Sequence, residues 1–282
     1  MAMMKTVFAP AKVNLCLHVA GRREDGYHDL ATLMQKVDIQ DRLDIILSAG
    51  TEITACCPQL ALPAGVENIA ARAARLFFSH IKEARGVTIR IGKSIPAAAG
   101  MGGGSSDAAS VLLALNKMLG LNLSKSELMS IGVRVGADVP FFLYGQSAAW
   151  ATGVGERLQP WPGLPPIVFV LVNPGIEVST AWVFKTLGLT CSRPVARIPR
   201  FPVGTRGLAH LLGNDLEAVT CQRHPVITTI KERLVAGGAA GALMSGSGPT
   251  VFGVFDDRGQ AEEVARTLSA ETDWWVRVVN PL

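Results

Sequence analysis

A glycine-rich run, Gly100-Met-Gly-Gly-Gly-Ser-Ser106, restricts how this chain can fold more than any other segment. It follows an alternating strand pattern at residues 87–91 (VTIRI) and precedes an apolar stripe at helical spacing over residues 107–119. Adjacent glycines let backbone N–H groups approach an anion, and a helix start adds about half a positive charge. Ser105 or Ser106 is expected to cap that helix. The run indicates a phosphate-binding loop or a flexible turn, and the strand–loop–helix order favours the first.

The run differs from the two best-known nucleotide-binding motifs. No Gly-Lys-Ser/Thr closes it, as a Walker A loop requires. It also lacks the GxGxxG spacing with an acidic residue about 20 positions further on. A dinucleotide-binding oxidoreductase is disfavoured for this reason, and phosphate binding would need a different architecture.

The composition is that of a globular chain with a large core. Of the 282 residues, 49% are hydrophobic and 18% are charged, which excludes a disordered chain and fits one large domain or two smaller ones. The five cysteines have no CxxC spacing, and the five histidines have no HExxH spacing. We therefore expect reduced thiols, a cytoplasmic protein and no structural zinc.

The net charge of +4 comes from one segment. No acidic residue lies between Glu177 and Asp215, but five basic residues do: Lys185, Arg193, Arg197, Arg200 and Arg206. A nucleic-acid-binding domain normally has a denser basic face with interleaved aromatic residues, so no nucleic-acid partner is expected. The arginines either form a solvated loop or attract an anionic ligand.

No membrane segment is expected. Residues 234–255 carry no charge and are long enough to span a bilayer. Six glycines and Pro249 interrupt them, which favours a turn between a helix and a strand. At the N-terminus Lys12 interrupts the apolar run, so a signal peptide is not predicted.

The remaining patterns favour the α+β class, because strands and helices mix without regular alternation. The predicted strands cover residues 13–19, 44–47, 87–91, 167–172, 250–255 and 275–279. The predicted helices cover 68–81, 107–119, 124–135, 180–187, 226–235 and 262–270, with capping-box spacing at Ser124 and Glu127. Residues 190–206 are predicted to be a loop or irregular insertion. A proline cluster at 155–166 predicts two domains, 1–160 and 161–282.

Three further segments place polar residues or glycines where core residues would be expected. Residues 10–15 (PAKVNL) set Lys12 and Asn14 on one side of a strand, as a solvated edge or a site. Residues 136–142 (GADVPFF) place Asp138 to cap the turn before Pro140, or as a site carboxylate that a nearby lysine would keep ionised. Residues 244–251 (MSGSGPTV) either pack two backbone segments closely or close over a ligand.

Four stretches, in order along the chain, resemble the motifs of the GHMP small-molecule kinase superfamily: residues 10–41, 95–116, 136–156 and 244–255. Gly26-Tyr27-His28 points to the member that phosphorylates the 2-hydroxyl of 4-diphosphocytidyl-2-C-methyl-D-erythritol with ATP, rather than to homoserine, mevalonate or galactose kinases. That reaction belongs to the non-mevalonate route to isoprenoid precursors. The resemblance implies a two-domain α+β fold with the active site in the inter-domain cleft.

The resemblance also implies the site residues. Lys12 and Asp138 match the family's catalytic lysine and aspartate, and Asn68 and Lys93 match positions at the adenine end. The ATP loop corresponds to Pro96, Ala97, Ala98, Ala99, Gly100, Met101, Gly102, Gly103, Gly104, Ser105 and Ser106, with alanines at 97–99 where some relatives have glycines. The substrate side corresponds to Asn14, Tyr27, His28, Thr180 and Phe184, and cytosine is expected to stack on Tyr27 or Phe184. Mg²⁺ is expected to bridge the β and γ phosphates, with Ser106 as its candidate protein ligand.

The implied mechanism gives the two catalytic residues different tasks. A carboxylic acid is far more acidic than an alcohol, so Asp138 would orient the hydroxyl and accept its proton late, in a loose transition state. Lys12 would keep Asp138 charged and polarise the hydroxyl or the γ-phosphate. The alternatives are another GHMP kinase, such as homoserine kinase, and a non-catalytic ligand-binding member of the fold. We expect a small-molecule substrate with a cytidine diphosphate group, no nucleic-acid or membrane partner, and a monomer or weak homodimer.

Overall fold

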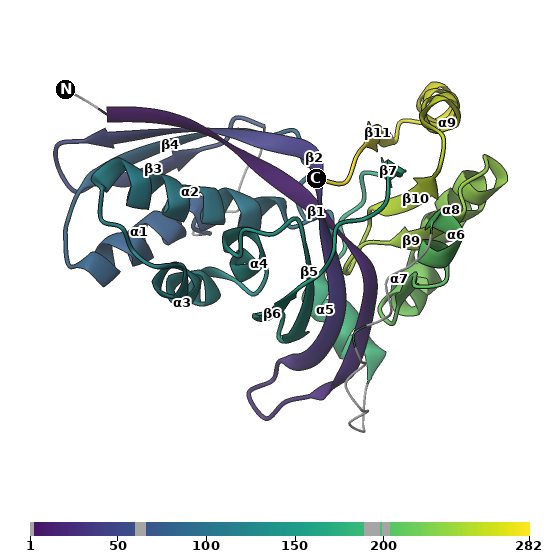
Figure 1. Cartoon of the computed structure of the whole chain (residues 1–282), viewed down its shortest axis with the longest axis horizontal. Helices are drawn as coiled ribbons and strands as arrows, with labels where there is room; N and C mark the ends of the chain where they lie inside the picture. The colour runs from purple at the N-terminus through teal and green to yellow at the C-terminus, as the bar shows by residue number, and fades with distance from the viewer. Residues whose placement is uncertain (1–2, 60–65, 189–197, 199–203) are drawn as a thin grey trace. The chain divides into compact units, whose positions relative to one another are not determined.

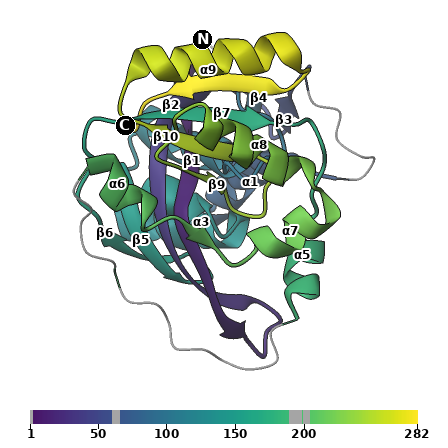
Figure 2. The same ribbon diagram turned by 90° about the vertical axis from the view of Figure 1, so that its right-hand side faces the viewer.

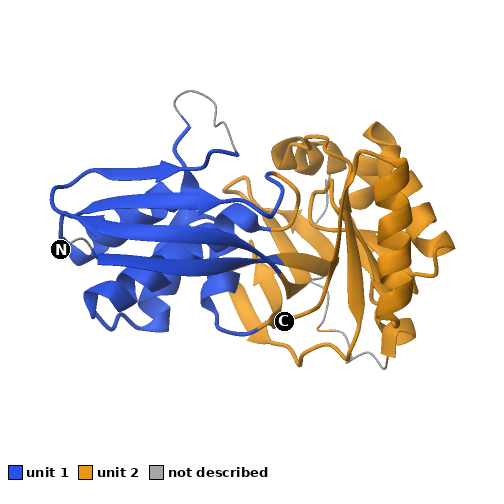
Figure 3. Ribbon diagram, turned by 90° about the horizontal axis from the view of Figure 1, so that it is seen from above, with its two compact units in different colours: residues 1–11, 39–97, 102–146 blue, residues 12–38, 98–101, 147–282 orange. Residues whose placement is uncertain are grey.

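The computed structural model describes residues 3–59, 66–188, 198 and 204–282 (Figure 1). The chain forms two compact units (Figure 3). Unit 1 comprises residues 1–11, 39–97 and 102–146, and unit 2 comprises residues 12–38, 98–101 and 147–282. These units differ from the expected division at residue 160. The reason is that the two longest strands, β1 (Met3–Arg22) and β2 (His28–Ser48), each contribute residues to both units.

Unit 1 is a sheet with helices on one face (Figure 1). Its strands follow the order β3 (Ile53–Cys56), β4 (Gly86–Gly92), β2 and β1. β4 pairs antiparallel with β2, from Arg42 opposite Gly92 to Ser48 opposite Gly86, and parallel with β3. The helices are α1 (Ile69–Ile81), α2 (Gly103–Leu119), α3 (Lys125–Val135) and α4 (Val139–Leu143). Their apolar faces bury large side chains such as Phe77 and Phe141.

Unit 2 contains a four-stranded antiparallel sheet in the order β11 (Trp275–Val279), β7 (Val168–Asn173), β10 (Val251–Phe255) and β9 (Gly241–Met244). Helices α8 (Val226–Ala236) and α9 (Arg258–Glu271) contact this sheet (Figure 2). Alternate residues of β7, Val168, Val170 and Val172, share one buried cluster with Ile230 and Leu268 from these helices. The apolar run of β7 is continuous because both of its faces are buried.

The remaining strands of unit 2 pair with its portions of β1 and β2. β8 (Gly213–Asn214) runs parallel to β1 at Cys16 and Leu17. β5 (Ala148–Gly153) runs antiparallel to β2 and also pairs with β6 (Arg157–Pro160). The other helices of this unit are α5 (Thr180–Leu187), α6 (Gly204–Ala209) and α7 (Glu217–Arg223). These pairings support the part of β1 that carries Lys12 and Asn14.

Several predicted elements are confirmed. Helix α5 and strand β11 have the predicted bounds. Asn68 caps α1 by accepting a hydrogen bond from the N–H of Ala70, and the capping box of α3 is present. These elements depend on neighbours in sequence, which a local pattern contains. The uncharged stretch 234–255 ends α8 and then forms β9, a turn and β10. No helix among the described residues is long and apolar enough to cross a membrane.

Other expectations were wrong or incomplete. β1 and β2 are much longer than predicted, since they extend well beyond the predicted strands at residues 13–19 and 44–47. Helix α2 begins at Gly103 rather than at residue 107. Of the predicted irregular segment 190–206, residues 204–206 are helical and, apart from residue 198, the rest lies outside the described residues. The short elements β3, α4, β5, β6, β8, α7 and β9 were not predicted.

Replacing Asp257 by alanine should destabilise unit 2. The Oδ1 atom of Asp257 caps α9 by accepting a hydrogen bond from the N–H of Gln260 at 2.8 Å. Loss of a cap costs about 1 kcal/mol, so we expect Tm in scanning calorimetry to fall by about 2–4 °C. The control is Glu263→Ala, at an exposed position of the same helix, which should change Tm by less than about 1 °C. Equal falls in the two variants would contradict the capping role.

Candidate active site

The glycine-rich run forms the N-terminal turn of α2. The cap residue is Gly102, with φ 67°, and it makes no side-chain capping hydrogen bond. By contrast, side chains of Asn68, Ser124, Ser179 and Asp257 cap α1, α3, α5 and α9. The prediction that Ser105 or Ser106 caps α2 is therefore wrong, since both lie inside the helix. The uncapped N–H groups fit an anionic ligand.

Two glycine-rich segments of unit 2 approach each other at Gly100, which has φ 73°. A β-carbon at this position would lie 2.1 Å from the carbonyl oxygen of Ser245 and 3.1 Å from that of Gly248. The hydroxyl of Ser245 donates to the carbonyl of Gly100 at 2.9 Å, and the N–H of Thr250 donates to Ala99 at 3.4 Å. Residues 244–251 therefore pack against the glycine-rich run, which is the first of the two roles proposed for them.

Lys12 and Asn14 are buried, with exposed fractions of 3% and 2%, so the solvated-edge interpretation is wrong. The N–H of Lys12 donates to the carbonyl of Met101 at 3.0 Å, and its ammonium donates to Oδ1 of Asn14. Asn14 in turn donates from Nδ2 to Thr32 at 2.8 Å and from its backbone N–H to the hydroxyl of Ser245 at 3.2 Å. A buried ammonium is costly to desolvate, so its retention in a hydrogen-bonded network indicates a function.

The substrate-side residues predicted in unit 2, other than Asn14, lie in three different settings. The rings of His28 and Phe184 stack with centroids 4.9 Å apart, and burial, followed by the charge of Arg22, lowers the pKa of His28. The hydroxyl of Thr180 is 2.8 Å from that of Ser247, which places Thr180 beside residues 244–251. Tyr27 is 61% exposed, and its N–H donates to Oδ1 of Asp25 at 3.1 Å. The structure thus pairs His28 with Phe184, while the ring of Tyr27 is exposed.

In unit 1, Asp138 immediately precedes α4 and is half-buried. Its side chain makes no capping hydrogen bond, so the capping interpretation is wrong. Asn68, expected at the adenine end, uses its Oδ1 atom to cap α1 at 2.9 Å from the N–H of Ala70.

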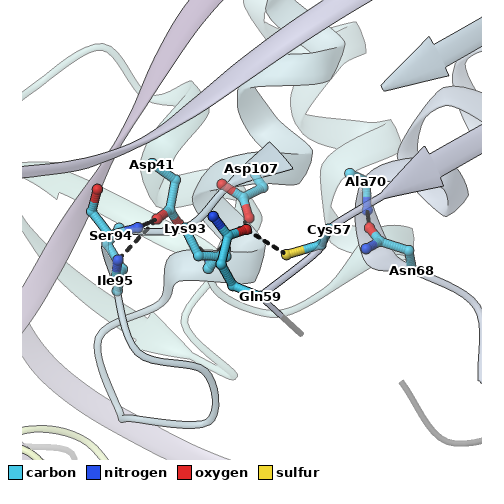
Figure 4. A network of polar contacts seen from close by, with 9 residues as sticks. All are labelled: Asp41, Cys57, Gln59, Asn68, Ala70, Lys93, Ser94, Ile95 and Asp107. Atoms are coloured by element: carbon cyan, nitrogen blue, oxygen red, sulfur yellow. Dashed lines mark hydrogen bonds and ion pairs between the residues drawn. The ribbon is translucent and has the colours of Figure 1, made fainter. Parts of the chain in front are cut away.

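Lys93 belongs to a buried network that the sequence did not predict (Figure 4). Its ammonium is paired with Asp41 and lies 3.2 Å from Oδ2 of Asp107. Burial would lower the pKa of Lys93, but the charges of Asp107 and Asp41 outweigh it and raise the pKa. Burial, with the nearby charge of Asp41, raises the pKa of Asp107 to about 7 despite the opposing charge of Lys93. The sequence did not single out Asp41, because Asp38, Arg42 and Asp44 are charged residues of the same strand.

No group of three or more His, Cys, Asp or Glu side chains within the described parts of the chain is arranged to hold a metal ion. The hydroxyl of Ser106 is buried and has no hydrogen-bond partner among the described residues. Such an unpartnered oxygen fits a single protein ligand for Mg²⁺, an ion that keeps several waters and binds substrate phosphates. The residues present therefore fit a metal held mainly by the nucleotide.

Comparison with known proteins identifies the family and the fold. Residues 68–146 match the GHMP kinases N terminal domain, and residues 205–272 match the GHMP kinases C terminal family. A crystal structure of 4-(cytidine 5'-diphospho)-2C-methyl-D-erythritol kinase superposes with a TM-score of 0.78 at 38% identity, covering 99% of this chain and 100% of that one. A homoserine kinase from Cytophaga hutchinsonii, at 18% identity, has a TM-score of 0.74, covers 99% of this chain and 95% of that one, and shares the fold. Both halves of the chain thus have the GHMP kinase fold.

Two relatives with the same printed name match nearly the whole chain. The 4-diphosphocytidyl-2-C-methyl-D-erythritol kinase of Syntrophotalea carbinolica is 55% identical, covering 99% of each chain. That of Geobacter metallireducens is 50% identical, covering 98% of each chain. Among the GHMP kinases, this chain belongs to the 4-diphosphocytidyl-2-C-methyl-D-erythritol kinase family.

Replacing Gly100 by alanine should disrupt the contact between the glycine-rich run and residues 244–251. The added methyl group would overlap the carbonyl of Ser245, and the backbone cannot yield without breaking the hydrogen bonds at Gly100. We expect kcat/KM for ATP to fall at least tenfold in steady-state assays. The control is Gly120→Ala, where φ is 63° but no atom lies within 4 Å of the added carbon. It should cost about 1–2 kcal/mol of stability and leave kcat/KM unchanged within about twofold. Similar losses of activity in both variants would point to backbone strain alone.

Proposed function

We propose that this chain transfers the γ-phosphoryl group of ATP to the 2-hydroxyl of 4-diphosphocytidyl-2-C-methyl-D-erythritol, giving the 2-phosphate and ADP. The observation that carries the proposal is the buried Lys12. Its backbone is bonded to Met101 in the glycine-rich run, and its ammonium is bonded to Asn14, a predicted substrate residue. This network joins a cation, the nucleotide loop and the substrate side within unit 2. The names of the full-length relatives agree with it.

ATP binding is assigned to residues 96–106. The uncapped first turn of α2 offers backbone N–H groups and the positive end of the helix dipole to the phosphates. When bound, Mg²⁺ would neutralise charge on the β and γ phosphates, and Ser106 would supply its protein ligand. Asn68 and Lys93 are assigned to the nucleotide on the basis of the family resemblance.

The chemical step is assigned to Asp138 and Lys12. Little covalent chemistry is needed in phosphoryl transfer, so these residues act by orientation and charge. Asp138 would orient the 2-hydroxyl and accept its proton as the new O–P bond forms. Lys12, held by Asn14, would stabilise negative charge that develops on the transferring group. Asn14 would therefore have two roles, contacting the substrate and positioning Lys12.

Recognition of the cytidine end is assigned to Tyr27, His28 and Phe184. The lowered pKa of His28 favours its neutral form, which can both donate to and accept from a polar base edge. The exposed ring of Tyr27 and the face of Phe184 offer stacking surfaces, with about 1–3 kcal/mol available per stacked base. Thr180 is assigned to the polar part of the substrate, since its hydroxyl already pairs with Ser247.

We further infer a cytoplasmic protein that acts on small molecules as a monomer or weak homodimer, without nucleic-acid or membrane partners. The absence of CxxC spacing supports reduced thiols, and the net charge of +4 is confined to one segment. Arg206 of that segment lies in α6, whereas Arg193, Arg197 and Arg200 lie outside the described residues.

Replacing Asp138 by asparagine should lower kcat by about 10²–10⁴, because the amide cannot accept the hydroxyl proton. Lys12→Met should also lower kcat, rather than raise only the KM for ATP. A coupled assay for ADP release with both substrates measures these effects. The control is Asp273→Asn, at an exposed position in unit 2, which should retain wild-type kcat.

A double variant tests whether the two residues serve one step. If they act together, Lys12→Met in the Asp138→Asn background should cost much less than it does alone. Retention of most of kcat by Asp138→Asn would remove it from the chemistry. An effect of Lys12→Met on the KM for ATP alone would make Lys12 a binding residue.

A substrate panel tests the acceptor. We expect kcat/KM for the cytidine diphosphate substrate to exceed that for homoserine or mevalonate by at least about 10³. An acceptor without the cytidine diphosphate group would leave polar groups of the site without hydrogen-bond partners, which weakens its binding. Comparable or better use of homoserine would favour the alternative kinase. No turnover of any acceptor, with ATP still bound in calorimetry, would favour a non-catalytic member of the fold.

A further inference from the structure

A buried ion-pair network in unit 1 joins three charged residues from separate elements (Figure 4). Asp41 lies in β2, Lys93 directly follows β4, and Asp107 lies in the second turn of α2. The side chains of Asp41, Asp107 and Lys93 are 0%, 4% and 12% exposed. The ammonium of Lys93 is therefore held between two carboxylates that belong to the sheet and to the helix.

Asp41 uses its two oxygens for different partners. Oδ2 pairs with Lys93, while Oδ1 accepts hydrogen bonds from the N–H groups of Ser94 at 2.6 Å and Ile95 at 2.9 Å. Ser94 and Ile95 immediately precede residues 96–106, the segment assigned to ATP. A single buried carboxylate thus orients both Lys93 and the backbone that enters the nucleotide loop.

The ammonium of Lys93 also lies against the first residue of α2. A β-carbon at Gly103 would be 3.2 Å from Nζ of Lys93 and 3.1 Å from Cγ2 of Ile95, closer than ordinary contact. Gly103, the middle one of three consecutive glycines, therefore leaves room for the ammonium of Lys93. The network and the uncapped helix start occupy the same part of unit 1.

The placement of this cation is unfavourable for the helix alone. The N-terminus of a helix carries partial positive charge, so cations are stabilising at the other end. Here the two carboxylates offset the repulsion and keep the ammonium beside the uncapped N–H groups of α2. With two carboxylates around one ammonium the group carries no net positive charge, so the ion pairs fix where the Lys93 side chain lies rather than attract an anion.

We propose that Asp41 and Asp107 are positioning residues for nucleotide binding: they hold the side chain of Lys93, a residue assigned to the nucleotide, at the first turn of α2. This inference rests on the proposed kinase function and adds two residues to it. Asp41 is the principal one, because it also orients the backbone at Ser94 and Ile95.

The first test is Asp41→Asn. The amide keeps an oxygen for the N–H groups of Ser94 and Ile95 but replaces the charged oxygen that faces Lys93. We expect the KM for ATP to rise about tenfold, with the KM for the cytidine diphosphate substrate within twofold and kcat within about threefold of wild type. A general loosening of the fold would instead alter all three parameters.

The second test asks whether Asp41 acts through Lys93. Lys93→Met removes the ammonium and should raise the KM for ATP at least as much as Asp41→Asn does. In the double variant the KM should stay within twofold of that of Lys93→Met, because the carboxylate then has no ammonium to place. If the KM for ATP of the double variant rose by the product of the two single increases, the inference would be overturned.

The third test does not depend on the folding of an Asp41 variant. Asp107→Asn removes the other carboxylate, and calorimetry with the non-hydrolysable analogue AMPPNP should show about threefold weaker binding. The matched control is Asp44→Asn, also in β2, where Asp44 accepts from the hydroxyl of Thr6 at 2.6 Å and pairs with Arg42 at 3.2 Å. Its AMPPNP affinity and KM for ATP should match wild type within twofold.

A structural role alone would give a different result. If folded variants of Asp107 and Lys93 showed a lower Tm but bound AMPPNP within twofold of wild type, the inference would be overturned. Failure of the kinase proposal would give a different result. The wild-type chain itself would then bind AMPPNP, or release ADP, no better than the Gly100→Ala variant does. That outcome would overturn both proposals.

Discussion

The close contact between Gly100 and Ser245 is the constraint on which the arrangement of unit 2 depends. It requires a residue without a side chain, because a β-carbon would lie 2.1 Å from a carbonyl oxygen. Once the two backbones meet, the hydroxyl of Ser245 bonds to Gly100 and accepts from Asn14, and Met101 accepts from Lys12. A glycine thus determines where a buried lysine lies.

Both units bury charge beside the nucleotide loop, although buried charge is a poor source of stability. Removing one partner of a buried ion pair costs about 3–5 kcal/mol, while an apolar replacement of the whole pair is often neutral or stabilising. Lys12 in unit 2 and Asp41 with Lys93 in unit 1 are retained beside segments of residues 96–106. The ammonium of Lys12 is bonded to Asn14, and that of Lys93 to Asp41 and Asp107, as buried polar groups require.

The local parts of this fold could be predicted, and the non-local parts could not. Ser124 and Glu127 lie three residues apart, so their capping box can be recognised from neighbouring residues in the sequence. The motifs around Lys12, Gly100 and Asp138 were also recognisable, because close backbone approach and isolated polar residues leave visible patterns. Asp41 was missed, because its partners Lys93 and Asp107 are 52 and 66 positions away in the chain.

Sequence alone was enough to identify the kinase superfamily and to predict a nucleotide loop and two candidate catalytic residues, since these depend on residue type and order. Tertiary structure decided which polar residues are buried, which helix start is left uncapped, and how residues 12–38 join unit 2. The physical reason is that desolvation and hydrogen-bond partnership are properties of the packed chain. Lys12 looks like an edge residue in its strand, and only the packed chain shows that it is buried, with its backbone N–H bonded to Met101.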